Sequence, residues 1–419
     1  MQALPGFREL YPADTARRSV IIDTWRRTAR SHGFDEYDAP TLEPLELYSR
    51  KNAGGEEILG QLYRFEDGGG RAVALRPEMT PSLARMAAAR EKHFRKPMKW
   101  FSVGSFFRYE RQQRGRLREF LQFNADLIGD ASPAADGELI ALAVDSLRQL
   151  GFSPADVVVR LSHRGAWTRF LTEKGVPEHS LPAVLQVADK LERETADKLA
   201  SRLQGTGIQL EDIHAFIAGP VPQELQPVID NLADRGLKDF LQLDLSIVRG
   251  LAYYTGTVFE IFDRAKSLRA VAGGGRYDGL IRLLSDGAVD LPAIGFAMGD
   301  VVLSHLIEAT PPASDLLATR SAALMACDVF LVVADESRRP EAFRLLQNLR
   351  DSGLRADLTL TPNQRVGKQF QAAESATARH AVVVGSEWPL VKVKTLATRE
   401  ESSLPHEGLA DWLKNHHLP

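Results

Sequence analysis

The chain has 419 residues, a length that predicts two or three domains because single hydrophobic cores rarely grow beyond about 250–300 residues. Hydrophobic residues make up 44% and charged residues 26%, as in an ordinary globular protein, and the formal net charge is -3. The single cysteine, Cys327, excludes an internal disulfide framework and a cysteine-based zinc cluster. We expect a cytoplasmic protein that does not span a membrane, since the sequence has neither a signal-peptide pattern at its start nor an apolar run of spanning length.

Residues 71–86 (RAVALRPEMTPSLARM) predict a strand, a Pro-Glu corner and a helix. Thr80 is expected to be the N-cap and Pro81 the first helical residue. Glu78 is therefore predicted at the junction between a strand and a helix N-terminus, where side chains often face a ligand. A solvated loop glutamate is the alternative.

Residues 106–129 (FFRYERQQRGRLREFLQFNADLIG) predict a β-hairpin with one face rich in polar and charged side chains. With a period of two, the polar face of its second strand carries Phe120, Gln122, Asn124 and Asp126, and the core face carries Leu121, Phe123, Ala125 and Leu127. The hairpin also contains Arg108, Arg111, Arg114, Arg116 and Arg118. This group of arginines in a slightly acidic chain indicates a site for a compact anion, or else an amphipathic hairpin with solvated arginines.

A polar, helical segment at about 167–238 interrupts the strand patterns and predicts an inserted helical module. Strands resume at 241–262, where Arg249 precedes a glycine and is soon followed by Tyr253 and Tyr254. A second arginine beside a glycine break suits phosphoryl or nucleotidyl transfer, because positioned cations stabilise the transition-state charge. A surface arginine beside core tyrosines is the alternative.

Other familiar sites are missing from the sequence. It has no GxxxxGK[ST] motif, and the GGGRYDG run at 273–279 does not match GxGxxG, so that run predicts a tight turn or a close backbone approach. It also has no HExxH metal motif and no GxSxG nucleophile elbow.

The segment 309–315 (ATPPASD) predicts a linker to a small carboxy-terminal α/β domain. In this domain, strand patterns at 328–335, 355–360 and 380–387 alternate with helical patterns, which indicates a largely parallel sheet. Its first helix is expected to point Phe343, Leu346 and Leu349 inward.

Several of these stretches together resemble one family. FRYERQQRGRLREFLQFNADLIG resembles motif 2 of class II aminoacyl-tRNA synthetases, and VRGLAYYTGTVFE and AGGGRYDGL resemble the two signature peptides of histidyl-tRNA synthetases. PGFRELYP, LRPEMT and the carboxy-terminal domain resemble the same family in the same order, so the resemblance covers nearly the whole chain.

The resemblance implies an α+β catalytic domain on an antiparallel six-stranded sheet, with the helical insertion at about 167–238, and a carboxy-terminal α/β anticodon-binding domain. The implied limits are 1–312 for the catalytic domain, 313–322 for a linker and 323–419 for the anticodon-binding domain. It also implies a homodimer formed partly around Pro40.

The implied activity is that of a histidine–tRNA ligase, which makes histidyl-adenylate from histidine and ATP and transfers the histidyl group to the 3′ end of tRNA(His). Mg²⁺ is expected with the ATP phosphates, and no metal site of the protein itself is expected.

The resemblance also assigns residues by matching position. Arg108 and Arg249 are the implied catalytic residues, which bind the α-phosphate. The implied ATP-binding residues are Arg108, Glu110, Arg116, Arg118, Phe120 and Arg269. The implied histidine-binding residues are Glu78, Thr80, Arg108, Gln122, Asp126, Arg249, Tyr253 and Tyr254.

The chain departs from the family pattern at three places. Asp126 stands where many bacterial members carry glutamate, and Ala252 where they usually carry aspartate. Motif 3 normally ends in Gly-x-Glu-Arg, but the matching run GFAMGDVVL has no arginine. A divergent branch resembling cyanobacterial and plant organellar members is similar at the last two places, and we predict that Arg269 supplies the missing positive charge.

Two other functions are compatible with the same resemblance. One is the synthetase-like, histidine-sensing regulatory subunit of ATP phosphoribosyltransferase, which typically lacks an anticodon-binding domain. The other is a paralogue that activates histidine without charging tRNA.

Overall fold

A computed structural model describes residues 2–49, 58–110, 115–191, 194–248 and 253–416. The chain forms two compact units, residues 1–318 and 319–419, and helix α13 (Pro311–Met325) crosses the division between them. The segment 313–322, expected as a linker, is therefore helical. Its alanines and leucines favour a helix, and the two prolines of α13 lie in the first turn, where proline is tolerated.

The main sheet of the first unit has eight strands within the described residues, and it is mixed rather than antiparallel. In spatial order the strands are β1 (Asp35–Glu36), β5 (Met98–Phe107), β6 (Glu119–Ile128), β11 (Ala293–Gly299), β10 (Ala272–Arg276), β9 (Thr257–Asp263), β7 (Val157–His163) and β8 (Leu241–Leu243). The six central strands are antiparallel, while β1 and β8 add parallel edges. The prediction of a six-stranded antiparallel sheet is therefore wrong at both edges, because strands of two or three residues are too short to show a period in the sequence.

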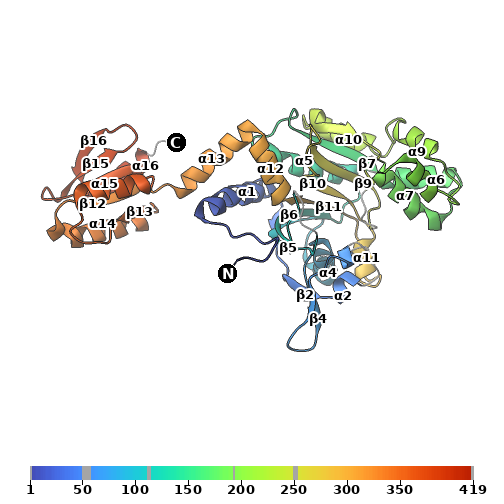
Figure 1. Ribbon diagram of the computed structural model, residues 1–419, viewed down its shortest axis with the longest axis horizontal. Helices are drawn as coiled ribbons and strands as arrows, with labels where there is room; N and C mark the ends of the chain where they lie inside the picture. Colours follow the sequence, from blue (N-terminus) through green and yellow to red (C-terminus); the bar gives the residue numbers. More distant parts are fainter. Residues whose placement is uncertain (1, 50–57, 111–114, 192–193, 249–252, 417–419) are drawn as a thin grey trace. The chain divides into compact units, whose positions relative to one another are not determined.

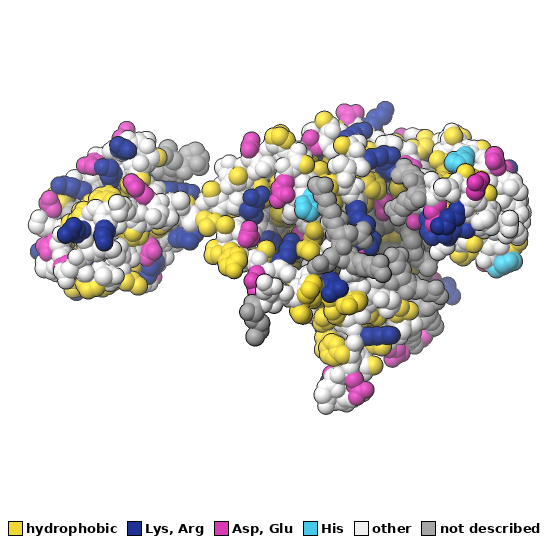
Figure 2. Space-filling model, viewed as in Figure 1, with side chains coloured by type: hydrophobic (Ala, Val, Ile, Leu, Met, Phe, Trp, Pro, Cys, Tyr) yellow, Lys and Arg dark blue, Asp and Glu magenta, His cyan; other side chains and the backbone are white. Residues whose placement is uncertain are grey.

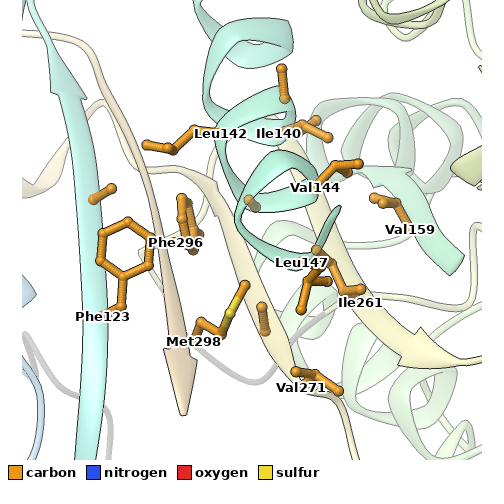
Figure 3. Packing of buried hydrophobic residues seen from close by; sticks show 14 of the residues in the cluster. Phe123, Ile140, Leu142, Val144, Leu147, Val159, Ile261, Val271, Phe296 and Met298 are labelled. Atoms are coloured by element: carbon orange, nitrogen blue, oxygen red, sulfur yellow. The ribbon is translucent and has the colours of Figure 1, made fainter. Parts of the chain in front are cut away.

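One face of this sheet packs against helices and forms the main core (Figures 1 and 3). The helices are α1 (Pro12–Ser31), α5 (Pro133–Arg148), α10 (Gln226–Asp234) and α12 (Asp300–Ala309). All four residues on the predicted core face of β6 belong to this core, so that prediction is confirmed. Phe123 of β6, for example, meets the ring of Phe296 on β11 edge-on, with 5.3 Å between centroids (Figure 3).

The opposite face of the sheet is covered at one end by α4 (Thr80–Arg90) and α11 (Leu280–Leu284). Met79 is the N-cap of α4, so the cap predicted at Thr80 is one residue late, and Pro81 lies in the first turn. A small sheet precedes α4 and has the order β2 (Leu42–Pro44), β4 (Ala72–Leu75) and β3 (Arg64–Glu66). Helix α2 (Glu46–Ser49) and a 3-10 turn at Glu91–His93 also belong to this region.

A group of short helices lies between β7 and β8 (green in Figure 1). They are α6 (Arg164–Glu173), α7 (Leu181–Lys190), α8 (Ala196–Arg202) and α9 (Leu210–Ile217), with 3-10 turns at Glu178–Ser180 and Lys238–Phe240. These helices bury their own apolar cluster around Trp167, whereas α10 packs on the main core.

The second unit is a mixed sheet, in which five strands are described, flanked by helices. The strand order is β13 (Ala356–Leu358), β12 (Val329–Val333), β14 (His380–Val384), β15 (Leu390–Thr395) and β16 (Glu401–Pro405). The helices are α14 (Arg339–Asp351), α15 (Val366–Ser375) and α16 (Leu409–Asn415), with 3-10 turns at Glu336–Arg338 and His406–Gly408.

The first three strands of the second unit are parallel, as predicted, but β15 and β16 add antiparallel pairs. Leu346 and Leu349 of α14 are buried as predicted, whereas Phe343 is 43% exposed and its predicted burial is wrong. Ala342 and Leu345 occupy the inner face of the helix in its place.

In the described part of the chain, no helix combines the length and the apolar character needed to cross a membrane.

Candidate active site

A cavity of ≈ 680 Å³ lies over the polar face of β6 in the first unit. Its walls come from β6, β9, β10 and β11, from the turn before α4, and from the segment after β5. The predicted site residues that line it are Glu78, Thr80, Arg108, Glu110, Arg116, Phe120, Gln122, Asp126, Tyr253, Tyr254 and Arg269. The fold therefore collects side chains from three distant parts of the sequence in one space.

Glycines on β10 and β11 allow this cavity to approach the sheet backbone. Gly275 and Gly295 lie opposite each other in the β10–β11 register. A Cβ atom on Gly295 would lie 1.8 Å from Asp126 Oδ1, and one on Gly275 would lie 2.8 Å from the Tyr254 ring. The close backbone approach predicted for the glycine run is thus observed, in a strand rather than a tight turn.

Asp126 is the most deeply buried acid of the cavity, with 4% of its surface exposed. The Tyr277 hydroxyl donates a hydrogen bond of 2.6 Å to Asp126 Oδ1. Burial raises the pKa of the Asp126 carboxyl to about 7, and the bond from Tyr277 acts in the opposite direction. Sequence reasoning did not assign Tyr277, although it lies in AGGGRYDGL, because only the β10–β11–β6 pairing brings it to Asp126.

A second polar group lies at the turn between β4 and α4. The Tyr253 hydroxyl lies 3.2 Å from Glu78 Oε2 and is placed to donate a hydrogen bond to it. Thr80, the first residue of α4, and Gln122 also line the cavity. Gln122 Oε1 is buried and has no hydrogen-bond partner within the described residues, which leaves an unbonded acceptor in a residue that lines the cavity.

Arginine and aromatic side chains lie together just after the end of β5 and at the start of β6, next to the loop that joins these two strands. Arg108 Nε donates to the Pro77 carbonyl at 3.0 Å, and its guanidinium lies 5.4 Å from the centroid of the Phe120 ring. Glu110 forms an ion pair with Arg116. The Pro77 carbonyl thus holds Arg108 at the cavity wall, beside a flat ring on which a base could stack.

Among the predicted arginines that the structure describes, Arg118 is not brought to the cavity. Arg118 packs over the Tyr109 ring, and its Nε donates to the Glu110 carbonyl at 3.3 Å. Arg118 is not among the side chains that line the cavity. Arg249, predicted as the second catalytic arginine, lies outside the described residues, as does Ala252.

The region that replaces motif 3 begins at Asp300, the first residue of α12. Asp300 is buried, accepts a hydrogen bond from the Leu121 backbone nitrogen at 2.9 Å, and forms an ion pair of 2.6 Å with Arg8. A buried acid therefore fastens α12 to β6 and to the amino-terminal segment, and its partner Arg8 comes from PGFRELYP.

Val302 stands where the arginine of motif 3 would be if Gly299 is matched to the glycine of the motif. Val302 and Arg269 both line the cavity, and a Cβ atom on Gly115 would lie 3.5 Å from Val302 and 4.0 Å from Arg269 Cδ. The predicted substitute arginine and the altered motif 3 thus meet at the same edge of the motif 2 loop.

Comparisons with known proteins agree with this arrangement. Residues 6–300 match the family model of histidyl-tRNA synthetase, and residues 328–416 match that of an anticodon binding domain. A histidine–tRNA ligase of Opitutus terrae is 42% identical, with 97% of this chain and 96% of the relative covered. A chloroplastic/mitochondrial histidine–tRNA ligase of Arabidopsis thaliana is 38% identical, with 94% and 83% covered.

Among solved structures, the fold is similar to that of histidyl-tRNA synthetase from Nostoc sp. PCC 7120, with a TM-score of 0.77, 23% identity and 99% of both chains covered. It is also similar to a protein from Bacillus halodurans described as an ATP phosphoribosyltransferase regulatory subunit/histidyl-tRNA synthetase, with a TM-score of 0.70, 22% identity and 92% and 98% covered.

The fold and the family matches define a class II aminoacyl-tRNA synthetase with a carboxy-terminal anticodon-binding domain. More narrowly, the chain belongs to the histidyl-tRNA synthetase family. The resemblance inferred from the sequence motifs is therefore confirmed.

Proposed function

We propose that the chain is a histidine–tRNA ligase whose two steps take place in the cavity over β6. In the first step a carboxylate oxygen of histidine attacks the α-phosphorus of ATP, the bond to the β-phosphate breaks, and pyrophosphate leaves. In the second step a ribose hydroxyl at the 3′ end of tRNA(His) attacks the carbonyl carbon of histidyl-adenylate, and AMP leaves. The ligase function is supported by relatives over nearly the full chain.

The arginine-rich end of the cavity is proposed to hold ATP. Arg108, fixed by the Pro77 carbonyl, would contact the α-phosphate, and Phe120 would stack on adenine. Glu110 would accept from the adenine amino group, so its ion pair with Arg116 would open and free Arg116 for the phosphates. Arg249 is proposed as the second α-phosphate ligand, Arg118 as a residue of the motif 2 loop, and Mg²⁺ as part of the ATP substrate.

The opposite end is proposed to hold histidine. Glu78, Thr80 and Gln122 would bind the ammonium end, with Tyr253 positioning Glu78. Asp126 and Tyr254 would read the imidazole. A buried pocket that requires hydrogen bonds at the ring rejects analogues that lack them, since its own polar groups would be left without partners.

The observation that carries this proposal is the presence of both ends in a single cavity, with Arg108 and Phe120 at one and buried Asp126 at the other. Histidine-dependent exchange of pyrophosphate into ATP tests it. Arg108→Ala and Asp126→Ala should each lower exchange by at least about a hundredfold, the usual scale for losing a positioned charge at a reacting centre. Arg282→Ala, which removes an exposed arginine outside the cavity, is the matched control. Full exchange in both site variants would contradict the proposal.

Arg269 is proposed to take the place of the motif 3 arginine over ATP. Its support is its position on the cavity wall beside Val302, at the edge of the motif 2 loop. Arg269→Ala should raise the KM for ATP by about tenfold or more, while the KM for histidine changes little, because a lost contact to a charged group costs about 1.5–3 kcal/mol. An unchanged KM for ATP, with the Arg282→Ala control also unchanged, would contradict this role.

The second unit is proposed to bind the anticodon of tRNA(His), and its family match supports this role. The same match favours a ligase over a histidine-sensing regulatory subunit, which typically lacks this domain. The proposed limits, 1–312 and 323–419, enclose the two matched segments, 6–300 and 328–416.

A homodimer, implied by the resemblance, and a cytoplasmic location, expected from the sequence, complete the proposal. Leu42 and Phe65 on the small sheet are 42% and 51% exposed, and Figure 2 shows hydrophobic side chains gathered over this region. Such a surface is suited to burial against a second copy.

Sedimentation of the protein should give twice the mass of the chain. A Leu42→Glu variant should shift the measured mass toward that of a monomer.

A further inference from the structure

Asn124 is a cavity residue to which the proposal above gives no role. It lies on β6 between Gln122 and Asp126, and it pairs with Ser102 of β5 and Ala297 of β11. Only 4% of Asn124 is exposed, yet the residue lines the cavity. Its Nδ2 atom has no hydrogen-bond partner in the part of the chain that the structure describes.

An amide nitrogen in this position points to a ligand. A buried donor without a partner costs about 1–3 kcal/mol, so natural cores rarely keep one unless something else satisfies it. Ser102 Oγ, directly opposite on β5, is also buried without a partner among the described residues, but Ser102 does not line the cavity. Because an amide nitrogen carries two hydrogens, a bond to Ser102 would still leave one for a ligand.

The spacing along β6 indicates which part of histidine would meet Asn124. Side chains two residues apart on one face of a strand are separated by about 6.6–6.8 Å, so Asn124 lies midway between the proposed ammonium end at Gln122 and the proposed ring end at Asp126. In histidine, the ring nitrogen Nδ1 is nearer to the α-carbon and Nε2 is farther from it. The midway position therefore corresponds to Nδ1.

We propose that Asn124 Nδ2 donates a hydrogen bond to Nδ1 of the substrate imidazole while Asp126 accepts one from Nε2–H, and that Tyr254, which also lines the cavity, contacts the ring through its aromatic side chain rather than through a ring nitrogen. This inference rests on the proposed function and extends it to ring specificity. A neutral imidazole has one donor and one acceptor nitrogen, so this pair of residues selects the neutral ring in one tautomer. Tyr277 already donates to Asp126 Oδ1, and Oδ2 is left to accept from the ring.

The test measures pyrophosphate exchange with histidine and with its two ring-methylated analogues. Asn124→Ala should raise the KM for histidine about 5- to 30-fold, as expected for one lost hydrogen bond in a buried site, with the KM for ATP unchanged. The wild-type preference for histidine over Nδ1-methylhistidine should shrink in the variant, whereas the preference over Nε2-methylhistidine should persist. Asn124→Asp, which keeps the shape but replaces the donor, should lose as much as Asn124→Ala.

Ser102→Ala is the matched control, since it removes a buried polar group from the same strand pair outside the cavity, and its KM for histidine should stay within about twofold. Equal effects of the Ser102 and Asn124 variants, or an unchanged KM for histidine in Asn124→Ala, would overturn the inference. Absence of histidine-dependent exchange in the wild-type protein would instead overturn the proposed function.

Discussion

Gly295 illustrates how a single residue can leave the space that a neighbouring side chain of the site needs. Its α-carbon lies under the Asp126 carboxylate, so a methyl group there would overlap Oδ1. The residue has no side-chain chemistry of its own, and its importance follows only from the β11–β6 register, in which Gly295 pairs with Asp126.

Gly295→Ala is predicted to impair histidine use far more than ATP use. The added methyl group must displace Asp126 and its hydrogen bond with Tyr277, and we expect the KM for histidine to rise at least about tenfold, equivalent to 1.4 kcal/mol. Gly279→Ala is the control, because a Cβ atom at this exposed glycine would meet no atom within 4 Å and Gly279 does not line the cavity. If both variants keep the wild-type KM for histidine, the placement of Asp126 is wrong.

Single residues also show the limits of sequence reasoning. The polar face of β6 could be predicted because alternation is a local pattern, and the arginines of the hairpin indicated an anion site, whereas recognition of the histidine ring was implied only by the family resemblance. Tyr277 and Asn124 could not be recognised in the same way. Tyr277 meets Asp126 across 151 positions, and the missing partner of Asn124 is a property of packing rather than of sequence.

At the scale of elements, a charged network joins the end of α1 to α5. His32 is the C-cap of α1, and its ring nitrogens lie 3.1 Å from Asp145 Oδ2 and 3.5 Å from Glu138 Oε1. Hydrogen bonds to Asp145 and then Glu138 raise the pKa of His32 to about 9, while burial acts in the opposite direction. His32 is therefore protonated at neutral pH and holds the two helices together.

This network predicts a pH-dependent contribution to stability. Since the folded pKa lies above the ordinary value of 6.5, the contribution is complete below pH 6.5 and is lost as the pH rises through about 9. His32→Ala should lower the free energy of unfolding by about 1–2 kcal/mol at pH 6, after allowance for screening of the partly exposed carboxylates, and by clearly less at pH 10.

Urea denaturation at the two pH values measures this difference. His305→Ala serves as the control, because the ion-pair partner of His305, Glu308 at 3.6 Å, is exposed. A penalty for His32→Ala that is equal at pH 6 and pH 10 would contradict the ionic role of the network.

Elements with a strong period were predictable, and short or edge elements were not. The hairpin was predicted from its period of two and α4 from its capping residues, although α4 begins one residue earlier than predicted. The edge strands β1 and β8 have two and three residues, and every residue of β16 is polar or at most half-buried, so long-range pairing rather than local pattern creates them. Phe343 was assigned to the wrong face of α14 because Ala342 and Leu345 satisfy the same helical period.

At the scale of the whole molecule, the two compact units suggest that catalysis and recognition of the anticodon are carried out by different units. The described residues of the cavity all belong to the first unit, and the match to the anticodon binding domain lies in the second. Each unit has its own hydrophobic core, which favours independent folding.

A chain ending at Met325, which keeps all of α13, is predicted to retain histidine-dependent pyrophosphate exchange but to charge tRNA poorly. Exchange should stay within a few-fold of the full chain. Charging at low tRNA concentration should fall by about a hundredfold or more, since losing an interface worth about 3 kcal/mol has that effect. Equal loss of both activities would show that the second unit supports catalysis itself.

The most direct test of the account is aminoacylation of a tRNA(His) transcript by the full-length protein. We predict ATP-dependent attachment of labelled histidine to the 3′ end, abolished by Arg108→Ala and unaffected by Arg282→Ala. Histidine-dependent pyrophosphate exchange without any charging would identify a paralogue that only activates histidine. Failure of both reactions would contradict the assignment of a ligase.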